Sequence, residues 1–318
     1  MPQDETLLFI IFNAFIIGLL ALDLGVFHRN AHAVSIREAA TWSVVWVTLS
    51  LLFNAGIFYF MGPITGMEFL AGYLIEKALS VDNIFVFILI FSYFGVPARY
   101  QHKVLFWGIL GALVMRSIFI ALGTTLIARF DWILYIFGVV LIVSGWKMLF
   151  QKEVEVHPDK NFFIRLARRA FPVIQGFETS AFVVRRGGKI AITPLLLVLI
   201  TVETTDVVFA VDSIPAVFGV TRDPFIVYSS NVFAILGLRA LYFLLAGMMT
   251  SFAYLSYGLS LVLIFIGGKM LAEGYIHVPI GISLATVGGI LALSIIASIV
   301  RKRLDARTPG DPGAPGAP

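Results

Sequence analysis

Apolar segments that are long enough to cross a lipid bilayer follow one another along this chain. A membrane-spanning helix needs roughly 20 predominantly apolar residues. The chain has 318 residues, of which 59% are hydrophobic, and this composition excludes a soluble globular domain. We therefore predict an all-α polytopic membrane protein with about nine transmembrane helices. The predicted spans are residues 6–27, 41–62, 67–96, 103–127, 131–150, 192–220, 225–248, 254–276 and 280–300.

Two of these segments carry carboxylates in their interior. The sixth reads I-T-V-E-T-T-D-V-V-F-A-V-D-S-I-P and holds Glu203, Asp206 and Asp212. The third reads G-Y-L-I-E-K-A-L-S-V-D-N-I-F, and its Glu76 and Asp82 repeat the spacing of Asp206 and Asp212. An ionisable side chain inside the membrane costs several kcal/mol unless it is paired, protonated or bound to a cation. These five acids are therefore the first candidates for a functional site.

The acid motifs belong to a longer internal repeat. L-I-V-S-G-W-K-M-L at 141–149 matches L-I-F-I-G-G-K-M-L at 263–271. Between its acid motif and its lysine motif each unit also carries one arginine, Arg116 in the first and Arg239 in the second. Each unit is thus three spans long, and three crossings return the chain on the opposite side of the membrane. This predicts two inverted-topology three-helix repeats, a plan that recurs in secondary transporters.

The repeat divides the chain into six parts. We predict two N-terminal scaffold helices (1–66), the first repeat (67–150), a cytoplasmic loop (151–191), the second repeat (192–276), a last transmembrane helix (277–303) and a disordered Pro/Gly tail (304–318). In the loop, F-F-I-R-L-A-R-R-A-F predicts a short basic amphipathic helix on the anionic inner leaflet. F-V-V-R-R-G-G-K-I-A-I predicts a hairpin with a Gly-Gly turn.

The distribution of basic residues predicts the orientation of the chain. With the N-terminus outside, the cytoplasmic segments hold 16 Lys and Arg residues, whereas only Arg129 and Arg222 lie outside. Since cytoplasmic loops collect positive charge, we predict an outside N-terminus and an inside C-terminus. The net charge of +4 then reflects topology, and we expect no nucleic-acid partner.

Several kinds of chemistry are disfavoured by residues that the sequence lacks. There is no cysteine, which excludes disulfides and thiolate metal sites. No nucleotide-binding loop and no catalytic constellation are visible, so we predict neither an enzyme nor a resident cofactor. The first apolar segment follows M-P-Q-D-E, without a basic n-region or a cleavage site, and is predicted to be a retained span.

The acids offer oxygen ligands, which hard divalent cations such as manganese, magnesium or calcium prefer. We predict that the metal is bound by Glu76, Asp82, Glu203, Asp206 and Asp212. Additional ligands or charge partners are predicted to be Asn83, Ser213, Thr205, Asn231, Lys77, Arg116 and Arg239. Pro215 cannot donate a hydrogen bond to the carbonyl of Val211, so we expect the sixth span to break there and the third to break similarly.

An alternative interpretation makes the acids structural. Asp82 would then pair with Arg116, and Asp212 with Arg239, as buried ion pairs that only hold the helices together. Two arginines cannot neutralise five acids, however, which favours the cation-binding interpretation. Protonation of the crowded carboxylates is a further compensation, and it would make protons and cations compete for the same site.

At the level of whole motifs, the chain resembles the TerC family of integral membrane proteins and its Alx-type branch. The resemblance rests on W-S-V-V-W-V-T-L-S-L-L-F-N-A, G-Y-L-I-E-K-A-L-S-V-D-N, F-D-W-I-L-Y-I-F-G, F-A-V-D-S-I-P-A and S-N-V-F-A-I-L-G-L-R-A, in this order. It implies manganese(II) export across the bacterial cytoplasmic membrane, with tellurium resistance as an older association. It also implies that the five acids bind the exported ion.

From residues and resemblance together we predict a secondary transporter that exports manganese(II) by alternating access, with protons as the counter-ion. Two alternatives stay open. One is an exporter of another divalent cation or of a cationic solute. The other is a membrane interaction protein that contacts secretion or stress machinery through the loop at 151–190.

Overall fold

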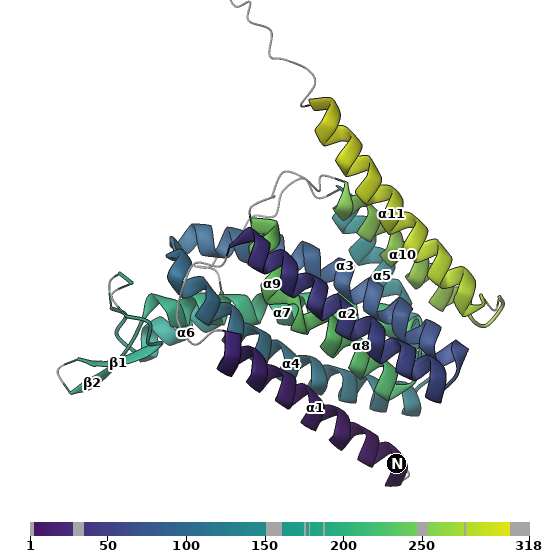
Figure 1. Cartoon of the computed structure of the whole chain (residues 1–318), viewed down its shortest axis with the longest axis horizontal. Helices are drawn as coiled ribbons and strands as arrows, with labels where there is room; N and C mark the ends of the chain where they lie inside the picture. The colour runs from purple at the N-terminus through teal and green to yellow at the C-terminus, as the bar shows by residue number, and fades with distance from the viewer. Residues whose placement is uncertain are drawn as a thin grey trace, which may run out of the picture.

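The computed structural model is an assembly of long helices with one small hairpin (Figure 1). It describes residues 3–27, 35–150, 161–174, 176–177, 179–186, 188–246, 254–276 and 278–305. The elements are α1 (Gln3–Phe27), α2 (Ile36–Phe60), α3 (Pro63–Phe94), α4 (Ala98–Arg129), α5 (Ile133–Phe150), α6 (Phe162–Ala170), β1 (Val183–Arg186), β2 (Lys189–Ile192), α7 (Pro194–Phe218), α8 (Pro224–Leu236), α9 (Leu238–Ala246), α10 (Leu255–Ala272) and α11 (Ile280–Asp305).

Every predicted span coincides with helix in the described chain, and the seventh is divided between α8 and α9. By length and composition, the helices that could cross a membrane are α2, α4, α5, α7, α10 and α11, or seven spans if the bent pair α8–α9 counts as one. The long helix α3 is not among them, and its interior carries Glu76, Lys77 and Asp82. The structure is therefore that of a nearly all-helical membrane protein.

Helix ends follow local sequence signals. Prolines occupy the first position of α3, α7 and α8, where the missing N–H is no loss. Asp223 caps α8 by accepting hydrogen bonds from the N–H groups of Phe225 and Ile226. Gly95 ends α3 with a φ of 63°, a left-handed conformation that glycine adopts without strain. Short connections thus return the chain quickly into the helical bundle.

The two repeat units interlock instead of packing as separate bodies. The acid helix α3 packs against α8 of the second unit, and the acid helix α7 packs against α4 of the first. The two lysine helices, α5 and α10, pack against each other along their length. Most of the interhelical contact in the core therefore joins one unit to the other.

Small residues set the close crossing of α5 and α10. A methyl group placed on Gly267 would lie 2.6 Å from the carbonyl oxygen of Gly138, and one placed on Gly145 would lie 2.7 Å from that of Ser260. Position 138 thus meets 267 while 145 meets 260, so the helices run antiparallel. Glycines at such crossings let two backbones approach closely.

The acid helices are continuous, which corrects the expectation that they break near their acids. α7 runs unbroken from Pro194 to Phe218 with Pro215 inside it. Pro215 stands in the last turn, where the helix ends anyway, so its missing N–H disturbs little. The break lies instead in the second arginine helix, where α8 and α9 meet at 41° beside Gly237.

The remaining helices flank this core. α2 packs against α3 and α9, and α11 packs against α10 and α3. α1 docks through aromatic rings, with Phe12 5.5 Å from Phe225 and 5.7 Å from Tyr228 between ring centroids. Figure 1 shows α1 and α11 on opposite sides of the molecule.

The segment between the units contains the predicted helix and hairpin. In α6, Ile164 is fully buried against Leu197 of α7, while Phe162 and Phe163 are exposed. β1 and β2 pair antiparallel, with Arg186 opposite Lys189 and Gly188 at a φ of 77° in the turn. Residues 151–160 and the tail from 306 onward lie outside the described part of the chain. The hairpin marks one end of the molecule, and the α10–α11 connection lies at the other (Figure 1).

Candidate metal-ion site

A buried arginine joins the two acid motifs. Arg116 of α4 donates from Nε to Oδ2 of Asp206 at 3.3 Å and from Nη2 to Oδ1 at 3.2 Å. This two-pronged geometry is the one in which a guanidinium binds a carboxylate most specifically. Nη1 of Arg116 also forms an ion pair with Oε1 of Glu76 on α3. One cation from the first unit therefore contacts an acid from each unit.

Neutral polar groups complete the surroundings of Arg116. Its Nη1 donates to Oγ of Ser213 at 3.3 Å and to Oδ1 of Asn231 at 3.0 Å. All of these side chains are buried, and Glu76 has no exposed surface at all. Within the described chain the Nδ2 group of Asn231 finds no hydrogen-bond acceptor. The cluster has one positive charge for two carboxylates and retains unused polar capacity.

The last acid of each motif accepts a hydrogen bond from the lysine helix of the other unit. Ser256 of α10 donates to Oδ1 of Asp82 at 3.1 Å. Ser144 of α5 donates to Oδ1 of Asp212 at 2.6 Å. Asp82 and Asp212 are partly buried, and their helices α3 and α7 contact α10 and α5, respectively. The two contacts are of the same kind, but the serines occupy different positions of the repeat, since Ser144 aligns with Ile266.

Glu203 faces a different environment from the other acids. Its carboxylate touches Gly111 of α4, where any larger side chain would collide with it. Glu203 and Thr205 line a cavity of about 1080 Å³ between α4, α6 and α7, whose walls are otherwise mostly apolar. Thr205 donates its hydroxyl to the carbonyl of Thr201 at 2.7 Å. Asn161, the N-cap of α6, donates to Thr204 at 2.7 Å and so ties α6 to the helix turn that carries Glu203.

The predicted charge partners other than Arg116 lie near the helix break. Lys77 donates from Nζ to the carbonyl oxygen of Ala234 at 3.2 Å. This carbonyl belongs to the last turn of α8, where the break removes the helical donors and a cation is favourable. Gly237 leaves room for the ammonium, because a methyl group there would lie 2.8 Å from it. Nη1 of Arg239 lies 3.4 Å from Nε2 of His102.

The structure brings only part of the predicted ligand set together. Glu76 and Asp206 meet at Arg116 with Ser213 and Asn231. Asp82 and Asp212 bond to serines instead, whereas Glu203 has no contact with Arg116 but interacts electrostatically with Asp206. Among the described residues no three His, Asp or Glu side chains come close enough to hold a metal ion in this conformation. The buried residue Asn83 follows Asp82 on α3.

The ion pairs of the structural alternative are also different from those expected. Arg116 pairs with Glu76 and Asp206, whereas Asp82 and Asp212 accept hydrogen bonds from serines. The order of motifs along the repeat suggested pairing within each unit. The interlocked helices instead place Arg116 beside the acid helix of the other unit.

Sequence reasoning did not identify Ser144 and Ser256. A usable signal existed, because Ser144 is the only serine or threonine in α5 and the sequence there is otherwise almost entirely apolar. A hydroxyl group inside a membrane helix commonly bonds to its own helix backbone. These two instead bond to acids on neighbouring helices.

Comparison with known proteins agrees with the motifs quoted above. Residues 61–306 match the family described as "Integral membrane protein TerC family". The chain is 51% identical over 292 residues to an uncharacterized membrane protein of Myxococcus xanthus, which covers 92% of each chain. It is 50% identical over 287 residues to a protein of Escherichia coli (strain K12) named "Putative membrane-bound redox modulator Alx", covering 87% of this chain and 89% of that one.

A protein of Salmonella typhi with the same name is 49% identical over 294 residues, covering 90% of this chain and 91% of the relative. No solved structure matches the chain significantly. The family match covers more than half of the chain, and it includes both acid motifs, Arg116 and Arg239. The chain therefore belongs to the TerC family of integral membrane proteins.

Proposed function

We propose that this protein is a secondary transporter that exports manganese(II) from the bacterial cytoplasm by alternating access, in exchange for protons. The observation that carries the proposal is the placement of Arg116 between Glu76 and Asp206. Two carboxylates from different units share one guanidinium in a fully buried position. Burying such a charged cluster costs free energy, and its presence therefore points to a function.

A cation can replace the arginine at these carboxylates. Two carboxylates with the hydroxyl of Ser213 and the amide oxygen of Asn231 offer only oxygen ligands, which suit a hard divalent ion. In the conformation described here the guanidinium occupies that position. Manganese is the expected ion within this class because the family resemblance implies it.

The contacts of the lysine helices support the inverted repeat. Aligning the lysine motifs equates Gly145 with Gly267 and Gly138 with Ser260. Exchange of the units then converts the contact of 138 with 267 into the contact of 260 with 145, and both contacts exist. An antiparallel pair with this exchange symmetry is what a two-fold axis between inverted units produces. Rocking of the units about this axis would expose the acids to each side alternately.

We infer nine crossings, with α1 and α3 added to the helices that qualify by composition. The N-terminus then lies outside the cytoplasmic membrane and the C-terminus inside, with α6 and the hairpin on the cytoplasmic side. The helix α7 would thus place Glu203, Asp206 and Asp212 at successive depths in the bilayer. A cysteine introduced at Thr6 or Asp131, in this cysteine-free chain, would report the outside by its labelling with a membrane-impermeant maleimide.

Proton exchange follows from the same carboxylates. Departure of a divalent ion leaves acids without compensation in a medium of low dielectric, and protons can restore neutrality. In proteoliposomes, manganese transport should fall when the pH gradient is collapsed at zero membrane potential. Unchanged transport under these conditions would exclude proton coupling.

Two alternatives stay open, and the names of the relatives suggest a third. An exporter of another cation would use the same cluster, and competition of magnesium or calcium with manganese uptake into inverted vesicles separates the cases. The relatives named as redox modulators suggest a second class, but this chain has no cysteine and thus cannot carry out thiol–disulfide exchange. A role in recruiting secretion or stress machinery would depend on the segment 151–190, and its deletion would abolish that role.

The decisive experiment measures intracellular manganese in cells that lack their own exporters. Wild type should lower the manganese content, whereas Asp206→Asn and Glu76→Gln at matched expression should not. Asp131→Asn, an equally conservative change at an exposed turn, is the control and should behave as wild type. Export by Asp206→Asn and Glu76→Gln equal to wild type would overturn the proposal.

A further inference from the structure

The cavity between α4, α6 and α7 combines apolar walls with a single carboxylate, that of Glu203. We call it the α6 cavity, and Figure 1 shows α6 beside α7 at the end of the molecule that carries the hairpin. Its volume is about 1080 Å³. Cavities that bind small organic molecules typically have about 300–1,000 Å³. Four aromatic rings line it, those of Phe119, Phe162, Phe163 and Phe171.

Glu203 differs from the other polar residues of the α6 cavity because its side chain has no bonding partner among the described residues. Asn161 donates to the hydroxyl of Thr204 at 2.7 Å. The hydroxyls of Thr204 and Thr205 donate to carbonyl groups of α7. The carboxylate of Glu203 is partly exposed in the cavity and interacts electrostatically with Asp206, which has the same charge. A carboxylate in apolar surroundings is stabilised by a cation, and the cavity walls offer none.

The arginines of α6 do not supply this cation. They are Arg165, Arg168 and Arg169, all of which are exposed and none of which lines the cavity. At 3.6 residues per turn they lie on a different face of α6 from Phe163 and Ala170, which do line it. Arg116 of α4 is engaged by Glu76 and Asp206. The counter-charge for Glu203 is therefore expected to come from a ligand.

The rim of the α6 cavity is apolar and accessible from outside. Phe162 is 62% exposed and Val208 is 64% exposed. The helices α4 and α7 qualify as membrane spans, so a rim on their outer surface faces lipid. A ligand that enters there must partition into the bilayer first. A lipid chain would cover the apolar walls but would leave Glu203 without a counter-charge, whereas the aromatic rings attract cations as the carboxylate does.

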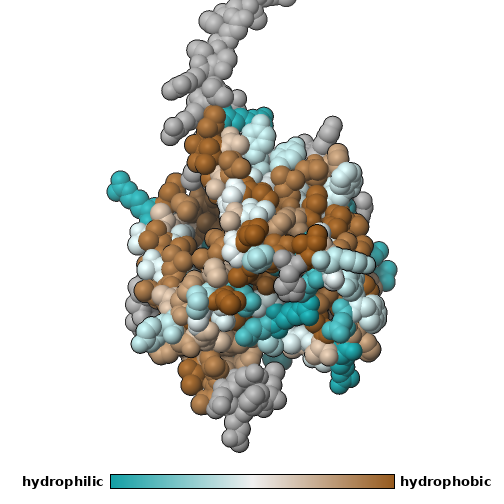
Figure 2. All heavy atoms as spheres, turned by 90° about the vertical axis from the view of Figure 1, so that its right-hand side faces the viewer, coloured by the Kyte–Doolittle hydropathy of each residue, from teal (hydrophilic) through white to brown (hydrophobic). Residues whose placement is uncertain are grey.

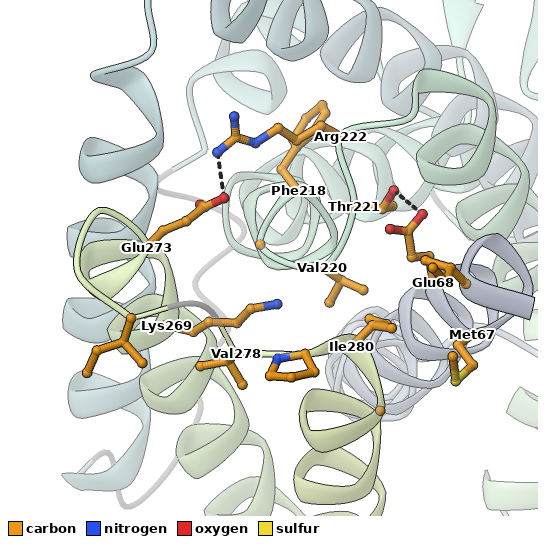
Figure 3. A pocket seen from close by; sticks show the side chains of 15 residues that line it. Met67, Glu68, Phe218, Val220, Thr221, Arg222, Lys269, Glu273, Val278 and Ile280 are labelled. Carbon is orange, nitrogen blue, oxygen red and sulfur yellow. Dashed lines mark hydrogen bonds and ion pairs between the residues drawn. The ribbon is translucent and has the colours of Figure 1, made fainter.

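The pocket at the opposite end of the molecule has the contrary character. Its volume is about 740 Å³, and Figure 2 faces this end and shows hydrophilic residues gathered between hydrophobic ones. There Glu68 accepts a hydrogen bond from Thr221 at 2.9 Å, and Arg222 lies 2.7 Å from Glu273 (Figure 3). These polar groups have partners within the protein. The α6 cavity is apolar and contains a carboxylate without one.

We propose that the α6 cavity binds lipophilic cations, in which an aromatic or alkyl body carries an ammonium or phosphonium charge. The body would contact the apolar walls, and the charge would lie near Glu203 and the phenylalanine rings. Such a ligand site goes beyond the proposed transport of manganese, and binding to it does not depend on that transport.

Two organic ions of nearly the same shape and opposite charge, tetraphenylphosphonium and tetraphenylborate, test this inference. Equilibrium dialysis of purified full-length protein in detergent, against micelles without protein, measures their binding. Wild type should bind tetraphenylphosphonium saturably and tetraphenylborate roughly ten-fold more weakly, because only the first can compensate Glu203. Glu203→Gln should weaken the binding of tetraphenylphosphonium by a similar factor. Asp212→Asn, an equally conservative change on α7 outside the cavity, should bind it as wild type does.

The double variant Phe162→Leu with Phe163→Leu keeps the wall apolar but removes two rings. It should weaken the binding of tetraphenylphosphonium about two- to five-fold. Unchanged binding by Glu203→Gln, in protein that elutes as wild type on gel filtration, would overturn the inference. Binding of tetraphenylborate as tight as that of tetraphenylphosphonium would also overturn it and would identify a cavity for lipid chains. Absence of manganese export by wild type in cells would refute the proposed function alone and leave these binding results unaffected.

Discussion

The acid helices of the two units, α3 and α7, place equivalent carboxylates in unequal surroundings. Glu76 corresponds to Asp206, and Asp82 corresponds to Asp212. Asp82 and Asp212 have similar partners, since each accepts a hydrogen bond from a serine of the other unit's lysine helix. Glu76 and Asp206 instead share a single arginine, Arg116, which belongs to the first unit. The units thus make similar contacts at Asp82 and Asp212 and unequal contacts at Glu76 and Asp206.

Two further differences in charge distinguish α3 from α7. α3 carries Lys77, whose ammonium binds the last turn of α8, at the position where α7 has Val207. α7 carries an additional acid, Glu203, where α3 has Tyr73. An inverted repeat with identical halves would offer the ion the same surroundings in both directions. The diverged charges make the two halves unequal, and four predictions test this distinction.

The largest effect is expected from removing the central cation. Arg116→Met leaves Glu76 and Asp206 buried without compensation, and breaking a buried pair in this way typically costs about 3–5 kcal/mol. We expect a strongly lowered thermal unfolding temperature in detergent and no export. Arg116→Lys keeps the charge but loses the two-pronged contact, so its loss of stability should be smaller. Equal stability of Arg116→Met and wild type would show that the centre does not depend on this residue.

Removal of the two serine contacts should have effects of similar size. Ser144→Ala and Ser256→Ala each remove a hydrogen bond to a carboxylate, which is worth about 1.5–3 kcal/mol. We expect similar losses of stability and of export rate from the two variants. Ser260→Ala is the matched control on α10, because its hydroxyl bonds only to the carbonyl of Ser256 on its own helix. A large effect of one variant and none of the other would show that Asp82 and Asp212 do not have matching roles.

The helix crossing provides a test of close packing. Gly267→Ala places a methyl group 2.6 Å from the backbone oxygen of Gly138, so the helices must separate, at a cost of about 1–3 kcal/mol. Gly268→Ala is next in sequence and meets open space. We expect only the first to lower the unfolding temperature. Equal behaviour of the two would argue against a tight α5–α10 contact.

The smallest effect concerns the helix break. Lys77→Met removes the donor to the carbonyl of Ala234 and a favourable charge at a helix end, together about 1 kcal/mol. Hydrogen exchange of α8 should become faster at its end, whereas Lys189→Met, an exposed substitution, should leave it unchanged. Unaltered exchange in Lys77→Met would mean that the break is stable without this contact.

Hydrophobic length predicted where helices lie because it is a local property of the sequence. Each predicted span begins and ends within a few residues of a helix. The break was misplaced because the effect of Pro215 depends on its distance from the helix end. The actual break, at Gly237, lies where Lys77 and Trp46 approach from positions that are distant in sequence. Local signals thus predict elements better than they predict bends.

The candidate site was predictable as a set of residues but not as a set of contacts. The acids were recognisable because charge is rare in apolar segments. Their partners depend on which helices are neighbours, and the interlocking of the units could not be read from the order of motifs. Arg116 therefore contacts Asp206 across 90 positions of sequence, whereas pairing within a unit had been the simpler hypothesis.

The interlocked units have a consequence for biosynthesis. Membrane helices enter the bilayer in the order in which the ribosome delivers them, so α3 and α4 arrive well before α7. Until then, Arg116 lacks the acid that binds it with two hydrogen bonds, and Ser144 lacks Asp212. Before α7 has been inserted, the first unit is consequently an incomplete intermediate whose polar groups lack their partners inside the membrane. Cellular quality control must tolerate or shelter the first unit until the second has been translated.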